Sequence, residues 1–114
     1  MWELKYYNVI FLEGARRFMQ TLDKRVAQKI LFVIAVAQQK QDPKFFKKLK
    51  GEIWEFRIRH MGAQIRLLSF WDNINAKESI VVVAVGFIKK TDKIPKDEFV
   101  KAKNIREKYF AEKG

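Results

Sequence analysis

The 114-residue sequence contains no cysteine and a single histidine, His60. Without cysteine, the chain cannot form disulfide frameworks, thiolate nucleophiles or cysteine-ligated zinc and iron–sulfur sites. One histidine poorly supplies a multi-histidine metal site or a Ser-His-Asp hydrolase. We therefore expect no metal site and no cofactor, and any chemistry must depend on Lys, Arg, Glu, Asp or Tyr side chains.

Long hydrophobic segments are also absent. The longest unbroken apolar run, Ile30–Ala37, is far shorter than the roughly 18–20 residues that span a bilayer. The residues Met1–Lys5 do not have the layout of a signal peptide. The sequence thus predicts a soluble, cytoplasmic protein without a membrane partner.

Acidic residues are few compared with basic ones. The chain has 24 Lys and Arg against 13 Asp and Glu, which gives a net charge of +11. Its hydrophobic content of 48% and aromatic content of 14% are too high for a disordered polyelectrolyte tail. A chain of this length is expected to fold as a single domain over residues 1–114. The charge favours an anionic polymer, and nucleic acid is the leading partner.

Hydrophobic periodicity predicts an α+β fold with the order β-α-α-β-β-β-α. An antiparallel sheet is expected to pack against an N-terminal helical hairpin and a C-terminal helix, with the helices on one face. Asp23 suits the N-cap of the second helix, and Pro95 suits the first helical position of the last one. The expected segments are a strand Trp2–Tyr7, helices Leu12–Leu22 and Asp23–Gln41, a basic connector Lys44–Gly51, strands Glu52–Arg59, Gln64–Trp71 and Ser79–Phe87, a loop Asp72–Glu78, and a helix from Pro95.

The second and third of these strands form a predicted hairpin that brings arginines together. If residues 60–63 form a four-residue loop, Arg59 pairs with Gln64 and Arg57 lies opposite Arg66. Like charges directly opposite each other destabilise a sheet. Two explanations remain open at this point: Glu55 compensates the arginines locally, or a bound phosphate lies between them.

Basic residues fall into three groups that the predicted topology brings to one side of the sheet. The connector group is Lys44, Lys47, Lys48 and Lys50; the strand group is Arg57, Arg59 and Arg66; the group after the last strand is Lys89, Lys90 and Lys93.

Residues 47–110 resemble the RelE/HigB toxins of bacterial type II toxin–antitoxin systems, and in particular their phage-derived HigB-like branch. Three blocks carry the resemblance: Lys48–Arg57, Ile65–Leu68, and Gly86–Thr91 followed by Pro95. The resemblance implies a toxin that enters the ribosomal A site and cuts messenger RNA during translation. It also implies inhibition by a cognate antitoxin, expected to be a helix-turn-helix protein that docks on the helical hairpin or beside the basic face.

The same resemblance suggests roles for individual residues. Arg66 would clamp the scissile phosphate, because a planar guanidinium can bind two phosphate oxygens, and Arg57 would be a second stabiliser. Lys89 or Lys90 would protonate the leaving oxygen. The family's tyrosine or histidine near the start of the last helix has no counterpart in Thr91–Ile94, so no general base is assigned. The expected RNA-binding residues are Lys47, Lys48, Lys50, Arg59, His60 and Lys93.

The aromatic residues divide into core and contact candidates. Trp54 and Phe56 share the apolar face of a strand and are expected in the core. Phe45 and Phe46 lie beside lysines and suit contact with an antitoxin. Trp71, at a strand end, could stack on a base or contact the antitoxin. Tyr109 belongs to the core stripe of the last helix unless that helix folds over the site.

Two other functions compete with the ribonuclease hypothesis. A ParE-like protein has the same fold but does no chemistry and inhibits DNA gyrase; the cluster of arginines and lysines favours the ribonuclease over it. A module that binds RNA or the ribosome without cutting cannot be separated from the ribonuclease by sequence.

Overall fold

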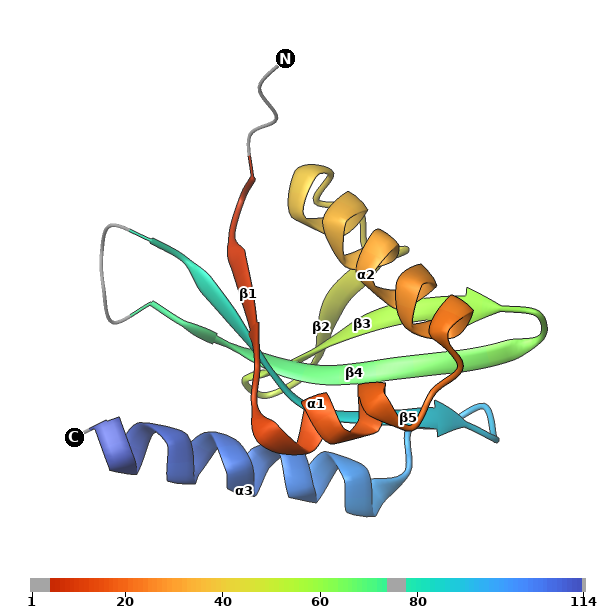
Figure 1. Ribbon diagram of the computed structural model, residues 1–114. Helices are drawn as coiled ribbons and strands as arrows, with labels where there is room; N and C mark the ends of the chain where they lie inside the picture. The colour runs from red at the N-terminus through yellow and green to blue at the C-terminus, as the bar shows by residue number, and fades with distance from the viewer. Residues whose placement is uncertain (1–4, 74–77, 114) are drawn as a thin grey trace.

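The computed structural model describes residues 5–73 and 78–113, which form a five-stranded sheet and three helices (Figure 1). This confirms the predicted α+β class. The elements in chain order are β1 Asn8–Phe11, α1 Glu13–Gln20, α2 Lys24–Gln39, β2 Phe46–Lys50, β3 Ile53–His60, β4 Ala63–Asp72, β5 Ile80–Lys89 and α3 Lys96–Lys113. None of the helices in these ranges is long and apolar enough to cross a membrane.

The sheet is mixed, which corrects the prediction of an antiparallel one. Its strand order is β1-β5-β4-β3-β2, and β1 runs parallel to β5 while the other pairs are antiparallel. The first strand also lies later than predicted, because Asn8 pairs with Ile80. Residues 2–4 of the predicted strand lie outside the described residues. The partner of β1 is far along the chain, so no local signal in the sequence reveals the direction or the register.

β2 replaces the predicted basic connector. Phe46 pairs with Phe56 and Lys47 pairs with Glu55, so β2 forms the second edge of the sheet. Phe46 is buried, Leu49 is half-buried, and the three lysines are exposed. Lysines are typical of edge strands, where they discourage pairing with other chains. The lysines and the irregular pairing between Lys48 and Lys50 leave no hydrophobic alternation in the sequence that would have revealed this strand.

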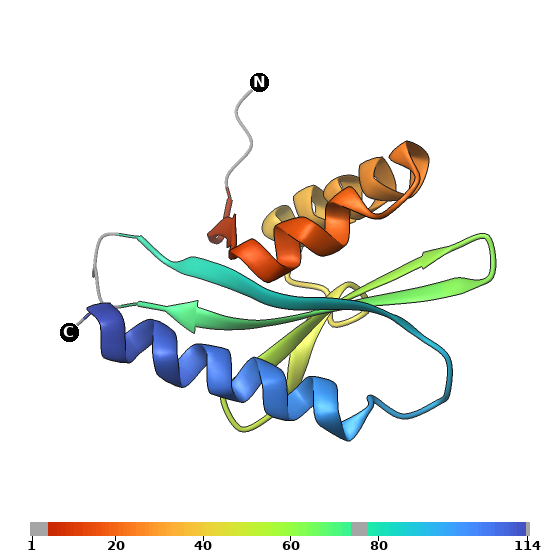
Figure 2. The same ribbon diagram turned by 60° about the horizontal axis from the view of Figure 1, so that its bottom comes forward.

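Helices cover both faces of the sheet, not one as predicted. Figure 2 shows α1 and α2 on one side and α3 on the other. On the first side, Ile30 and Ile34 of α2 belong to one core with Phe56 of β3. On the other side, Ala102 of α3 is fully buried with Leu68 and Phe70 of β4. Val81–Val85 in β5 is buried throughout, as predicted for a strand covered on both faces.

Local signals for the helices and the hairpin are largely confirmed. The side chain of Asp23 accepts a hydrogen bond from the backbone N–H of Arg25 at 2.8 Å and caps α2. The predicted pairs Arg57–Arg66 and Arg59–Gln64 are both present. The loop is shorter than predicted, because His60 already pairs with Ala63 and belongs to β3. The turn residues Met61 and Gly62 have φ of 48° and 83°, as tight hairpin turns of type I′ require.

Candidate functional site

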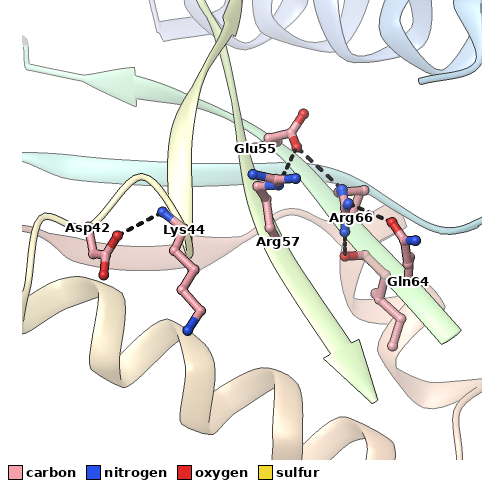
Figure 3. A network of polar contacts seen from close by, with 7 residues as sticks. Asp42, Lys44, Glu55, Arg57, Gln64 and Arg66 are labelled. Carbon is pink, nitrogen blue, oxygen red and sulfur yellow. Dashed lines mark hydrogen bonds and ion pairs between the residues drawn. The ribbon is translucent and has the colours of Figure 1, made fainter. Parts of the chain in front are cut away.

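Arg57 and Arg66 lie directly opposite each other on β3 and β4 and share the carboxylate of Glu55. The Nε atoms of both arginines lie 3.3 Å from Oε1 of Glu55 (Figure 3). Of the two explanations left open by the sequence, the structure thus supports local compensation by Glu55. A single carboxylate serves two guanidinium groups, so positive charge remains in excess at this point of the sheet.

The two arginines differ in exposure and in their contacts. The Arg66 side chain is 5% exposed, and that of Arg57 is 36% exposed. Arg66 donates from Nη1 to the carbonyl of Ile65 at 3.1 Å and from Nη2 to Oε1 of Gln64 at 2.9 Å. These contacts fix the Arg66 guanidinium in place, while the Arg57 guanidinium remains accessible to a ligand.

Electrostatics at Arg66 reflect this crowding. Burial lowers the pKa of the Arg66 guanidinium from its ordinary value; Glu55 raises it, and the charges of Arg57 and Arg59 lower it further. The Nε–H groups of Arg57 and Arg66 are buried and make no hydrogen bond within the described residues, although both are close to Glu55. A buried donor without an acceptor costs stability. The pair carries one positive charge more than Glu55 compensates, and an anion that contacts the more exposed Arg57 side chain could balance it.

These arginines line a hollow of about 430 Å³, here called the basic hollow. Its walls come from α2, the segment before β2, β3 and β4. The lining residues are Lys29, Val33, Lys44, Phe45, Arg57, Ile58, Arg59 and Arg66. All the charged residues among them are basic. A concave surface lined by charges of one sign concentrates the opposite charge, so this hollow suits a phosphate group.

Lys29 and Lys44 are additions to the predicted site residues. Lys44 belongs to the basic group noted in the sequence, whereas Lys29 lies on a helix and carried no functional signal of its own. The available signal was spacing, because Lys29 and Val33 are four residues apart and share one face of α2. What places Lys29 beside the arginines is the packing of α2 on β3, which the sequence pattern did not specify.

The remaining predicted residues do not all converge on this hollow. Lys89 pairs with Gln64, which pairs with Arg59, so these three side chains project from the same face of the sheet. His60 is half-buried at the end of β3, and Lys90 and Lys93 are exposed between β5 and α3. Lys47 and Lys48 line a second hollow, and Lys50 lines a third beside α3. The β2 lysines divide between the two faces: Lys47 pairs with Glu55 and projects from the face of Arg57, whereas Lys48 pairs with Trp54 on the opposite face. The prediction that all three basic groups meet on one side is therefore wrong for Lys48.

The aromatic predictions have mixed outcomes. Phe56 is fully buried and Trp54 packs against the same core, as predicted. Phe46 is only 7% exposed and stacks on Phe56 with ring centroids 4.3 Å apart, so its predicted role as an exposed antitoxin contact is wrong. The error arises because the sequence did not reveal that Phe46 belongs to strand β2. Phe45 is half-buried and lines the basic hollow.

Tyr109 has the core role and lies away from the basic hollow. Its hydroxyl donates to Oδ2 of the buried Asp72 at 2.7 Å, and its ring packs edge-on against Phe70. Nζ of Lys113 lies 2.8 Å from the same Asp72 oxygen. Burial and the hydrogen bond to Asp72 raise the pKa of Tyr109. Tyr109 thus ties the end of α3 to the end of β4.

Comparison with sequence models of known families assigns the chain to one of them. The sequence model described as "Phage derived protein Gp49-like (DUF891)" matches residues 17–107. The chain belongs to this Gp49-like family. A comparison with curated proteins gives no match. The matched part of the Gp49-like chain extends from α1 into α3 and includes every residue of the basic hollow. In the described part of the Gp49-like chain, no group of three or more His, Cys, Asp or Glu side chains could hold a metal ion.

Proposed function

We propose that this Gp49-like chain is the toxin of a toxin–antitoxin system and cleaves messenger RNA on the ribosome. The observation that carries the proposal is the basic hollow, which five basic residues line, together with the sharing of one buried carboxylate by two of them, Arg57 and Arg66. The resemblance of residues 47–110 to RelE/HigB toxins and the Gp49-like membership support the same conclusion.

The chemistry requires positioning and charge more than a strong nucleophile from the protein. The RNA 2′-hydroxyl loses its proton and attacks the adjacent phosphorus, and the bond to the 5′-oxygen of the next nucleotide breaks. The products are a 2′,3′-cyclic phosphate and a 5′-hydroxyl that has gained a proton. Guanidinium groups that bind the non-bridging oxygens stabilise the negative charge of the pentacoordinate transition state.

The exposure of each side chain suggests its role. Arg57 is the more accessible arginine, which favours it over the buried Arg66 as the first contact of the scissile phosphate. Arg66, fixed by Gln64 and Ile65, supplies charge from the wall of the hollow. Lys89 projects from the same face as Arg59 and is the better placed of the two lysines to protonate the leaving oxygen. Lys90 lies beyond β5 and is the weaker candidate.

The test is induced expression in a bacterium followed by primer extension on a translated reporter message. Wild type should produce cuts that require translation. Arg57→Ala and Arg59→Ala should each lower cleavage by about 10²–10³-fold if each removes one transition-state contact. Lys96→Ala is the matched control, because it removes an exposed positive charge from α3 outside the hollow. Arg66→Ala is less informative, because it also leaves Glu55 buried with one partner fewer.

Each competing function has its own outcome in this experiment. Growth arrest with intact message would refute the ribonuclease and favour gyrase inhibition. Ribosome association without cuts would favour a binding module. Cuts that persist in the Arg57 and Arg59 variants would refute the assignment of the site.

We also propose a cognate antitoxin as partner, with an acidic or amphipathic segment that complements the basic chain. The exposed side chains Leu31 and Phe32 on α2, 52% and 63% exposed, support docking on the helical hairpin. Co-purification with the product of the adjacent gene tests this partner. A complex that left both the hairpin and the basic hollow uncovered would contradict it.

A further inference from the structure

A second hollow, of about 420 Å³, is lined by four aromatic rings and is here called the aromatic hollow. The rings belong to Tyr7, Phe46, Trp54 and Trp71. They form a continuous group: Trp54 and Trp71 meet edge to face with centroids 5.7 Å apart, and Phe46 lies 5.1 Å from Trp54. Trp54 and Trp71 are only half-buried, so parts of both indoles remain open to a ligand.

A buried polar group also lies in this wall. Tyr7 is 5% exposed, and its hydroxyl has no hydrogen-bond partner among the described residues. A buried hydroxyl without a partner is costly. A flat aromatic ligand would stack on the rings of the hollow, and the buried hydroxyl of Tyr7 lies behind this wall.

The rim of the aromatic hollow is basic. Lys47 and Lys48 of β2 are exposed residues of its lining, and no acidic residue of the described chain contributes to it. The Lys48 side chain projects from the same face as Trp54, with which it pairs, whereas Lys47 pairs with Glu55 and projects from the other face. Proteins commonly bind single-stranded RNA through aromatic rings that stack on its bases and lysines that bind its phosphates. An aliphatic protein side chain would use the rings but not the lysines.

The two hollows are neighbours. Val33 lines the basic hollow and Ala37 lines the aromatic one, and these residues lie one turn apart on α2, about 6 Å along its axis. The chain also passes directly from one hollow to the other, because Phe45 lines the first and Phe46 the second. One short stretch of single-stranded RNA could therefore occupy both.

We propose that the aromatic hollow binds an unpaired nucleobase of the RNA strand whose phosphate occupies the basic hollow. This inference rests on the proposed function and adds a subsite to it. The base stacks on Trp54 or Trp71, and the phosphate next to it contacts Lys48, which pairs with Trp54. The occupant is a nucleobase of any identity, because stacking uses the π-face that all bases share.

Tryptophan fluorescence of the full chain tests the subsite. The sequence has three tryptophans, so Trp2→Phe leaves an emission that comes from Trp54 and Trp71. The probe is a hexaadenylate with 2′-O-methyl sugars, which cannot be cleaved, and the comparison is a hexamer of the same backbone without bases. The hexaadenylate should quench the emission and bind about 5- to 150-fold more tightly than the abasic hexamer, the range measured for one stacked base.

Charge variants test the rim without altering the core. Lys47→Gln with Lys48→Gln should lower the slope of log affinity against log salt by about 0.7 for each phosphate that is no longer neutralised. Lys96→Gln with Lys108→Gln is the matched control, because it removes two exposed charges from α3. Trp71→Leu removes one of the two stacking rings and should weaken base-dependent binding, and its thermal unfolding shows whether the fold is kept.

Three outcomes would overturn the subsite. The first is equal affinity for the two hexamers with unchanged fluorescence. The second is an identical effect of the two lysine pairs. The third is a response to N-acetylphenylalaninamide but not to hexaadenylate, which would assign the hollow to a protein side chain.

The reporter assay with the Trp2→Phe chain separates this proposal from the proposed function. Message cleavage without base-dependent binding would refute the subsite alone. Base-dependent binding without cleavage would refute the ribonuclease and leave the subsite as an RNA contact.

Discussion

Replacing Glu55 with glutamine removes the negative charge that Arg57 and Arg66 share and changes little else. The amide has nearly the shape of the carboxylate and still offers one oxygen to an N–H donor. Both guanidinium groups keep their charges and their places on opposite strands, so the variant isolates the electrostatic part of the cluster. Like charges in directly opposed positions then repel without compensation.

The size of the effect follows from burial. Glu55 is 3% exposed and Arg66 is 4% exposed, and removing one partner from a buried ion pair costs about 3–5 kcal/mol. Two features place the cost of Glu55→Gln at the lower end of this range. The amide oxygen still accepts a hydrogen bond, and the half-exposed Arg57 side chain can turn toward water. We expect the free energy of unfolding to fall by about 3 kcal/mol, which lowers Tm by about 12 °C in a domain of this size.

Thermal and urea unfolding of the purified variant measure this loss. Glu52→Gln is the matched control, because Glu52 is exposed in the turn between β2 and β3, and a change within about 0.5 kcal/mol is expected there. Added polyphosphate should recover more stability in Glu55→Gln than in wild type, and an anion at 100 times its Kd recovers about 2.7 kcal/mol. Equal midpoints for the two variants would show that the shared carboxylate does not stabilise the cluster, and the reasoning would be wrong.

Two further substitutions test the packing beside the site. Tyr7→Phe removes a buried hydroxyl that lacks a partner among the described residues, so Tm at pH 7 should stay within about 1 °C of wild type or rise. Burial raises the pKa of the Tyr7 hydroxyl, so the unfolded chain releases this proton at a lower pH than the folded chain does. Wild type should therefore lose stability as the pH rises above about 10, and Tyr7→Phe should lose less there. Identical alkaline stability profiles of the two proteins would contradict this. Gly86→Ala places a methyl group 2.3 Å from the ring of Phe18 and should cost about 1–3 kcal/mol in urea unfolding. Phe18→Leu should recover part of that loss, and a Gly86→Ala variant as stable as wild type would refute the predicted clash.

The features that the sequence revealed have local causes. Asp23 caps α2 through a backbone N–H two residues away, and the pairing of Arg57 with Arg66 follows from the short distance along the chain between β3 and β4. A tight turn fixes the register of such a hairpin whether its loop is counted as two residues or four. The amino-acid sequence alone therefore predicts the arginine pair at the candidate site.

The features that the sequence did not reveal depend on distant contacts. β2 carries three lysines in five residues and is a strand because Phe46 pairs with Phe56 on the neighbouring strand β3. Lys29 reaches the candidate site only because α2 packs on β3. Glu55 can be identified as the carboxylate that compensates both arginines only once the structure shows that it is buried between them. Composition showed that an anion-binding surface was present, and tertiary packing determines which cations form it.

The parallel pairing of β1 with β5 has a consequence for how the chain is made. Asn8 leaves the ribosome before its partner Ile80, and synthesis of the intervening 70 or so residues takes about 4–14 s at typical rates. During that time Val9 and Phe11, which later pack against the first core, have no sheet to join. All the residues of the basic hollow lie between Lys29 and Arg66 and so are synthesised before β5. A nascent chain that stops short of β5 therefore contains the cations of the site but lacks the strand that joins β1 to the rest of the sheet.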